Sequence, residues 1–159
     1  MMNRIRCIHI LLFLLLLPFP AAIYAASWEA KVVSISNGDI IKVLKDGKQV
    51  KIRLTSIDCS EKGQPYGQRA KQFTADMVAD KVVKIWQTDT DHYRRIVGFV
   101  FVGDKNLNKE LLSDGLAWHY KYYSRDPEIA EFEFKARSDK RGLWAEQDPV
   151  PPWDWRKHK

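Results

Sequence analysis

The segment from Trp28 to Ile57 constrains the fold most, because it alternates apolar and polar residues and is broken by two tight-turn dipeptides. Alternation with a period of two is typical of half-buried strands. Asn37-Gly38 and Asp46-Gly47 are strong hairpin signals, since these dipeptides accept the positive φ angles of two-residue turns. The segment therefore predicts three short antiparallel strands joined in a meander.

The remainder of the chain predicts two more strands and about three helices. Val82 to Trp86 and Ile96 to Val102 are rich in the β-branched and aromatic residues that suit strands. Three- and four-residue apolar spacing around Phe73 predicts one helix, and capping residues Asn106 and Asp126 predict two others. Five strands with a helix after the third and more helices behind match an α+β, mainly β fold. This is the five-stranded Greek-key barrel of the OB type, which often binds nucleic acids.

The first 26 residues have the layout of a secretory signal peptide. They contain two arginines near the start, an apolar run from Ile8 to Leu17 and small residues at the end. The run is shorter than the roughly 20 apolar residues that cross a bilayer, although a retained membrane anchor is the alternative. We expect cleavage after Ala25 or Ala26, export to the periplasm or the medium, one domain covering residues 27–159, and no stable membrane association after cleavage.

Charge and cysteine content narrow the possible partners only slightly. The chain has 26 Lys and Arg against 20 Asp and Glu, and loss of the two leader arginines leaves 24 against 20, a net charge of +4. A mild positive excess suits an anionic partner without identifying one. Cys7 also leaves with the leader, so Cys59 has no partner for an internal disulfide.

Strand register brings two aspartates toward one end of the predicted sheet. Pairing around the Asp46-Gly47 turn, extended along both strands, sets Asp39 opposite Leu54. Asp58 lies four residues beyond Leu54, on the same face if the strand continues regularly. Carboxylate oxygens are the ligands of hard cations such as Ca²⁺, whereas no Cys or His pair has the spacing of a zinc site.

Glu61 and Arg53 flank these aspartates, and we refer to Asp39, Asp58 and Glu61 as the acidic corner. A carboxylate can orient or deprotonate water, and a guanidinium can hold the negative charge of a phosphoryl transition state. Together with a cation, such a set can cleave a phosphodiester. Strand parity, however, places Arg53 on the opposite face from Asp39, so either a bend intervenes or Arg53 acts elsewhere.

These residues also have plain structural explanations. Asp39 could be a turn residue, the segment from Asp58 to Glu61 a solvated loop, and Arg53 a surface strand residue. The basic stretches Lys135 to Arg141 and Arg156 to Lys159 most simply form solvated faces or a tail. The aromatic residues of the second half could stack bases, but such clusters are as often packing elements.

The tail from Pro149 to Trp155 is too apolar for a free linker and is expected to pack across the domain. Further motifs keep a fixed order along the chain: Asn37-Gly38-Asp39, Arg53 to Glu61, Tyr66-Gly67, Asp91 to Gly98, Gly115 to Trp118, Lys140 to Trp144 and Pro151 to Trp153. Through these motifs the chain resembles the staphylococcal nuclease (thermonuclease) family from about Trp28 to Trp155. The resemblance implies an OB-fold nuclease that uses Ca²⁺ to hydrolyse DNA and RNA on the 5′-oxygen side, leaving 3′-phosphate ends.

The resemblance also implies a metal site and a base. Asp39 and Asp58 would be carboxylate ligands of Ca²⁺, and the main-chain carbonyl of Cys59 a third ligand. Glu61 would be the general base or the residue that positions water. Cys59 stands where the family often has Thr or Ala, which matters little if only its carbonyl binds metal, and Ser60 replaces a frequent Pro.

The implied phosphate and nucleotide contacts come from further along the chain. Arg53 and Arg95 would bind the scissile phosphate, and Tyr93 with one of Tyr122 or Tyr123 would contact the nucleotide. The usual Tyr-Gly-Arg reads Tyr93-Arg94-Arg95 here, which exchanges a permissive glycine for a bulky cation.

Two alternatives stand beside an exported nuclease that acts as a monomer. One is a non-catalytic OB-fold nucleic-acid-binding module, which should have lost carboxylates or arginines that this chain keeps. The other is an adhesion or interaction domain that uses the tryptophan-rich tail.

Overall fold

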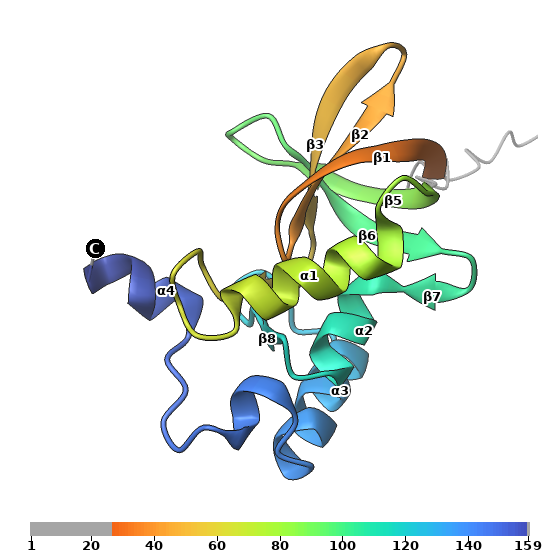
Figure 1. Ribbon diagram of the computed structural model, residues 1–159. Helices are drawn as coiled ribbons and strands as arrows, with labels where there is room; N and C mark the ends of the chain where they lie inside the picture. The colour runs from red at the N-terminus through yellow and green to blue at the C-terminus, as the bar shows by residue number, and fades with distance from the viewer. Residues whose placement is uncertain (1–26, 159) are drawn as a thin grey trace, which may run out of the picture.

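The computed structural model describes residues 27–158, and a closed five-stranded barrel forms one half of it (Figure 1). Its strands are β1 (Ser27–Asn37), β2 (Ile40–Lys45), β3 (Lys48–Leu54), β5 (Val82–Thr90) and β6 (Ile96–Val102). Antiparallel pairing links β3, β2, β1, β5 and β6 in that order, and parallel pairing of β3 with β6 closes the barrel. The α+β, mainly β prediction of an OB-type barrel is confirmed.

The register predicted from the second turn is also confirmed. Ile41 pairs with Ile52 across β2 and β3. Asp46 and Gly47 have φ angles of 49° and 73°. Positive φ at both central residues is the conformation that joins strands with the natural right-handed twist.

Alternate residues of the barrel strands point inward and form the core. The fully buried side chains include Val32, Ile41, Val43, Ile52, Leu54, Val83, Ile85 and Val100. Burial of each such side chain stabilises the fold by about 1.5–3 kcal/mol relative to exposure, so the barrel wall is a firm support for residues at its ends.

Four α-helices and two short 3-10 helices lie within residues 27–158. They are α1 (Gly67–Val78), α2 (Leu107–Ser113), α3 (Pro127–Ser138), α4 (Pro152–Trp155), η1 (Gly142–Ala145) and η2 (Arg156–His158). The three predicted helices are α1, α2 and α3, and α4 is additional. The predicted caps are confirmed, because the side chain of Asn106 accepts from the amides of Asn108 and Lys109, and that of Asp126 accepts from Glu128.

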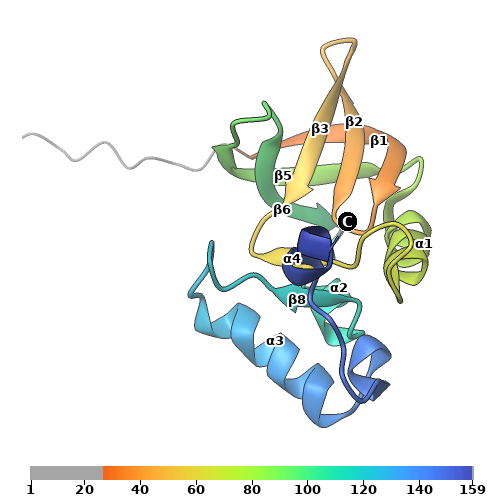
Figure 2. The same cartoon turned by 90° about the vertical axis from the view of Figure 1, so that its left-hand side faces the viewer.

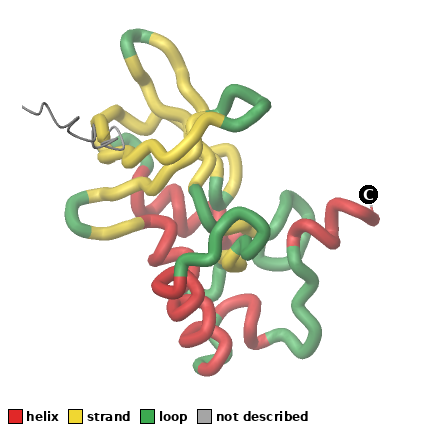
Figure 3. Tube along the Cα trace, turned by 180° about the vertical axis from the view of Figure 1, so that it is seen from behind, coloured by secondary structure: helices red, strands yellow, loops and turns green. Residues whose placement is uncertain are grey.

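The barrel strands gather in one half of the molecule, while α2 and α3 pack together in the other (Figure 3). Helix α1 packs against β1. The sequence did not predict three short strands: β4 (Ile57–Cys59) and β8 (Ala117–His119) pair with each other in a separate sheet, and β7 (Lys105–Asn106) extends the barrel sheet beyond β6. The β4–β8 pair joins the chain leaving the barrel to the chain entering α3.

The tail packs on the domain as predicted, because Trp153 contacts Trp118 and Tyr120, and its helix α4 lies at one side of the molecule, in front of the barrel and β8 in Figure 2. The proposed signal peptide, residues 1–26, lies outside the described residues. Within residues 27–158, no helix has the length and apolar character needed to cross a membrane.

Candidate active site

Asp39 and Asp58 meet at one end of the barrel and share one guanidinium. Asp39 lies in the turn between β1 and β2, and Asp58 lies in β4. Their exposed fractions are 2% and 3%. Arg53, at the end of β3, places Nη1 3.1 Å from Asp39 Oδ2 and Nη2 2.8 Å from Asp58 Oδ1. Two buried carboxylates are therefore held by one buried cation.

The path of the chain explains how Arg53 reaches both carboxylates. Strand β3 ends at Leu54 instead of continuing to Asp58, and Ser56 has a φ of 66° that turns the chain into β4. Asp39 has left the regular strand at this level, although its main-chain oxygen still accepts from the amide of Leu54 at 2.9 Å. The bend is therefore the alternative that the structure confirms for Arg53, and β3 lacks the regular continuation on which the argument for Asp58 was conditional.

Cys59 supports the corner through its main chain. Its amide donates to Asp39 Oδ2 at 2.8 Å. Its thiol points into the core, where a Cβ atom added at Gly38 would lie 2.9 Å from Sγ and 2.7 Å from the Cβ of Ala70. Burial first, and then the charge of Asp39, raises the pKa of the Cys59 thiol well above its usual value, so the thiol stays neutral. Because an added Cβ atom would collide with Ala70 and Cys59, close packing and not a positive φ explains the glycine at position 38.

The electrostatic balance of the corner is negative. Burial and the neighbouring charge of Asp39 raise the pKa of Asp58 to about 6, although Arg53 and Arg156 oppose the shift. Burial lowers the pKa of Arg53, but the two aspartates raise it by more, so its pKa lies above the usual value. Because the Asp58 carboxyl resists ionisation, its surroundings favour additional positive charge.

Glu61 lies in the loop after β4 and is tied to the tail. Its Oε1 accepts from Arg156 Nη1 at 2.7 Å, while Arg156 Nη2 lies 2.9 Å from Asp58 Oδ2. The loop is held by Gln64, whose Oε1 accepts from the amide of Glu61 at 2.9 Å and whose Nε2 donates to the oxygen of Val150 at 2.6 Å. The interpretation of Arg156 as part of a solvated tail was therefore wrong. The apolar residues of the tail from Pro149 to Trp155 were the sequence signal that this segment docks on the domain.

Arg95 does not join this cluster, and within residues 27–158 no ion pair links it to the acidic corner. It lies in the loop just before β6, the strand that pairs with β3, and its Nε is 2.6 Å from Asp91 Oδ2. Burial would raise the pKa of Asp91, but hydrogen bonds from the amide and side chain of Arg95 lower it below its usual value. Arg94 adopts a φ of 61°, the conformation for which the family's glycine is suited.

The predicted nucleotide-contacting tyrosines lie on two exposed loops. Tyr93 is 69% exposed, with the guanidinium of Arg95 5.3 Å from its ring centre. Tyr122 and Tyr123 are 82% and 70% exposed, and their rings meet edge to face at 4.9 Å. All three rings are largely exposed, as rings that stack on bases must be, although the ring centre of His92 lies 3.8 Å from that of Tyr93.

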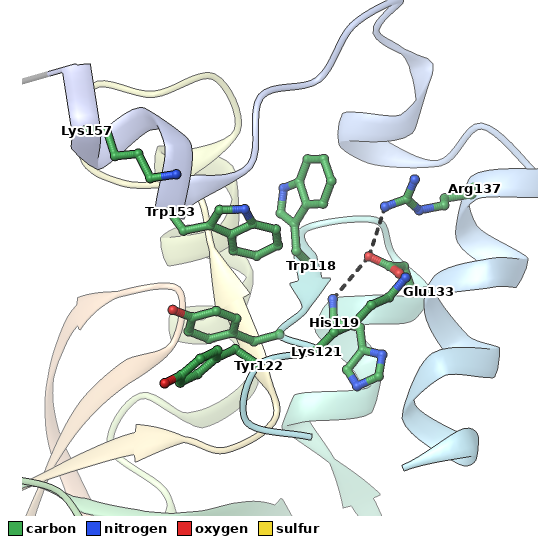
Figure 4. Close-up of a pocket in the computed structure, with 9 residues that line it drawn as sticks. Trp118, His119, Lys121, Tyr122, Glu133, Arg137, Trp153 and Lys157 are labelled. Carbon is green, nitrogen blue, oxygen red and sulfur yellow. Dashed lines mark hydrogen bonds and ion pairs between the residues drawn. The ribbon is translucent and has the colours of Figure 1, made fainter. Parts of the chain in front are cut away.

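A cavity of about 380 Å³ lies beside the second tyrosine loop (Figure 4). Trp118, Tyr120 and Trp153 form its aromatic wall, and Glu133 accepts from the amide of His119 and from Arg137 on its other side. Trp118 pairs with Asp58 across the β4–β8 ladder, so the cavity adjoins the acidic corner.

Comparison with known proteins places this architecture in a family. The family model described as "Staphylococcal nuclease homologue" matches residues 51–146, which include Arg53, Asp58, Glu61 and Arg95. The chain belongs to the staphylococcal nuclease family. Membership in this family makes the protein a nuclease, that is, a phosphodiester hydrolase.

Several relatives cover most of this nuclease. An uncharacterized endonuclease of Escherichia coli is 40% identical over 92% of this chain and 96% of its own length. An uncharacterized endonuclease of Haemophilus influenzae is 38% identical over 100% of this chain and 89% of its own. A micrococcal nuclease of Shigella flexneri is 34% identical over 83% of this chain and 82% of its own.

The carboxylate oxygens at the corner are donor atoms of the kind that a hard cation prefers. Among residues 27–158, no group of three or more His, Cys, Asp or Glu side chains is already arranged as a metal site. The donor set of this nuclease is instead two buried carboxylates, Asp39 and Asp58, drawn together by Arg53. Oxygen donors of this kind suit Ca²⁺, which completes its shell with main-chain carbonyls and water.

Proposed function

We propose that this protein is an exported, Ca²⁺-dependent endonuclease that cleaves DNA and RNA on the 5′-oxygen side and leaves 3′-phosphate ends. The observation that carries the proposal is the junction of two buried aspartates on Arg53, at 3.1 and 2.8 Å, with Glu61 beside them. Arginines next to carboxylates that can bind a cation are suited to cleaving the phosphodiester of a nucleic acid. The net positive charge of the mature chain would assist the approach of this polyanion.

Asp39, Asp58 and the main-chain carbonyl of Cys59 would hold the cation. Their positions are supported by the burial of both carboxylates and by the amide of Cys59, which fixes Asp39 at 2.8 Å. The chemistry that Ca²⁺ supplies when bound is neutralisation of phosphate charge and polarisation of a phosphoryl oxygen. The thiol of Cys59 would take no part, because it is neutral and packed in the core.

Glu61 would orient water for attack on phosphorus or accept its proton. Its carboxylate is 28% exposed, so it can face both solvent and substrate. Arg53 would bind the scissile phosphate and stabilise its transition state, and Arg95 would do so from the neighbouring strand. Tyr93 and one of Tyr122 or Tyr123 would contact the nucleotide through their exposed rings.

Export rests on the leader residues 1–26, with their two arginines, apolar run and small-residue end. The mass of the mature protein recovered from the periplasm or the medium tests this part, and we expect a chain that starts at Ala26 or Ser27. A protein that keeps all 26 residues and stays in the membrane fraction would indicate a retained anchor instead.

The proposal is tested by digestion of supercoiled plasmid and of RNA with Ca²⁺, with a chelator, and by the variant Glu61→Gln. We expect cleavage only with Ca²⁺, 3′-phosphate ends, and a loss of about 100-fold or more in Glu61→Gln. Glu131→Gln is the matched control, because it removes the same charge from an exposed position on α3. Equal cleavage in all conditions would refute the proposal. Tight single-strand binding without turnover at any Ca²⁺ concentration would favour the non-catalytic module.

A further inference from the structure

The tail of this nuclease places a second arginine, Arg156, at the acidic corner beside Arg53. Arg156 directs Nη1 to Glu61 Oε1 at 2.7 Å and Nη2 to Asp58 Oδ2 at 2.9 Å. One planar guanidinium therefore joins the proposed base to a proposed metal ligand. Forked contacts of this kind fix the direction of both partners, which a single point charge does not do.

The tail that carries Arg156 is firmly docked. Trp153 stacks on Tyr120 with ring centres 5.2 Å apart and planes 6° apart, and it meets the edge of Trp118 at 5.7 Å (Figure 4). Upstream, the oxygen of Val150 accepts from Gln64 at 2.6 Å. Aromatic contacts of this size contribute about 0.5–1.5 kcal/mol each beyond burial. Arg156 directly follows α4, so the packing of this helix holds Arg156 at the corner.

The two arginines on Asp58 differ in how easily they can be displaced. Arg53 is 14% exposed and also donates to the oxygen of Leu54 at 2.7 Å, so it belongs to the barrel end. Arg156 is 40% exposed, and its guanidinium binds the side-chain carboxylates of Asp58 and Glu61. A cation that approaches from solvent therefore meets Arg156 first.

Charge balance makes Arg156 and a divalent cation competitors. Three carboxylates of the corner face two guanidiniums, those of Arg53 and Arg156. Loss of Arg156 would leave Asp58 Oδ2 and Glu61 Oε1 without these partners, and a more negative corner attracts a divalent cation more strongly.

We propose that Arg156 is a positioning residue of the active site, which holds Glu61 and Asp58 in the metal-free enzyme and competes with the divalent cation for Asp58. This inference rests on the proposed function. It predicts that neutralising Arg156 has two opposite effects. The cation should bind more tightly because a competing charge is gone, and turnover should be slower because Glu61 is no longer oriented.

The test uses the purified protein and the variant Arg156→Gln. Calorimetric titration with CaCl₂ in the absence of nucleic acid should give a Kd about three- to tenfold lower than that of the wild type. With saturating Ca²⁺ and plasmid, kcat should fall about tenfold or more, because the water-positioning carboxylate loses its orientation. A residue with a merely structural role would not tighten cation binding.

Two further variants separate charge from geometry. Arg156→Lys keeps the charge but not the fork, so the Ca²⁺ Kd should stay within about twofold of wild type while kcat remains reduced at least about threefold. Arg141→Gln removes an equal charge from an exposed pair with Asp139, and it should leave Kd and kcat within about twofold of wild type.

The outcomes distinguish this inference from the proposed function. A wild type that binds Ca²⁺ and cleaves, together with an Arg156→Gln Kd within about twofold or a kcat within about threefold of wild type, overturns the inference alone. If Arg156→Gln does not fold, Arg156→Lys decides, and an unchanged kcat in that variant overturns the inference. A wild type that neither binds Ca²⁺ nor cleaves refutes the proposed function and the inference with it.

Discussion

Asp58→Asn is expected to stabilise the metal-free protein while it disables the active site. Burial and the charge of Asp39 raise the pKa of Asp58 to about 6 in the folded state. The folded protein therefore binds this proton more tightly than the unfolded chain does. The contribution of Asp58 to stability is fully present below the ordinary pKa of an aspartate and is lost as the pH rises through about 6.

The magnitude follows from the size of the shift. A change from 3.8 to about 6 corresponds to about 3 kcal/mol between the protonated and ionised forms at alkaline pH. Asparagine is neutral at every pH and has nearly the shape of the protonated acid. Asp58→Asn should therefore exceed the wild type by up to about 3 kcal/mol in free energy of unfolding at pH 8, and by little at pH 4.

Urea unfolding followed by tryptophan fluorescence, in a chelator and at several pH values, measures this difference. The exposed substitution Asp139→Asn is the control and should change stability by less than about 0.5 kcal/mol at each pH. An Asp58→Asn variant that is less stable than wild type at pH 8 would show that the contacts with Arg53 and Arg156 outweigh burial. A stability gain that does not change with pH would also refute the electrostatic reasoning.

Two further predictions concern the loop before β6. Arg95→Ala should lower the rate of plasmid cleavage by at least about 100-fold through lost transition-state stabilisation, and a loss below about threefold would exclude Arg95 from that role. Arg94→Gly should raise the free energy of unfolding by about 1 kcal/mol in thermal or urea unfolding, because Arg94 has a φ of 61° that glycine adopts without strain. A destabilised Arg94→Gly would mean that the side chain of Arg94 makes a compensating contact.

Local signals in the sequence were sufficient for the barrel and for the place of Asp39 at its end. The Asp46-Gly47 turn fixed the register of β2 and β3, which placed Asp39 beside Leu54, and capping residues marked the starts of α2 and α3. What could not be predicted depends on packing between distant segments. The β4–β8 pair joins residues about sixty positions apart, and the contact of Arg156 with Asp58 spans 98 positions, so no local pattern names the partner of either.

The position of Asp58 links the barrel to the tail. One of its carboxylate oxygens lies 2.8 Å from Arg53 of the barrel and the other 2.9 Å from Arg156 of the tail. The negative charge that would bind a cation is therefore the same charge that helps to fasten the tail over the corner. Protonation of Asp58, its replacement by asparagine and cation binding would each weaken its hold on Arg156, so we expect cation binding to loosen the docking of the tail.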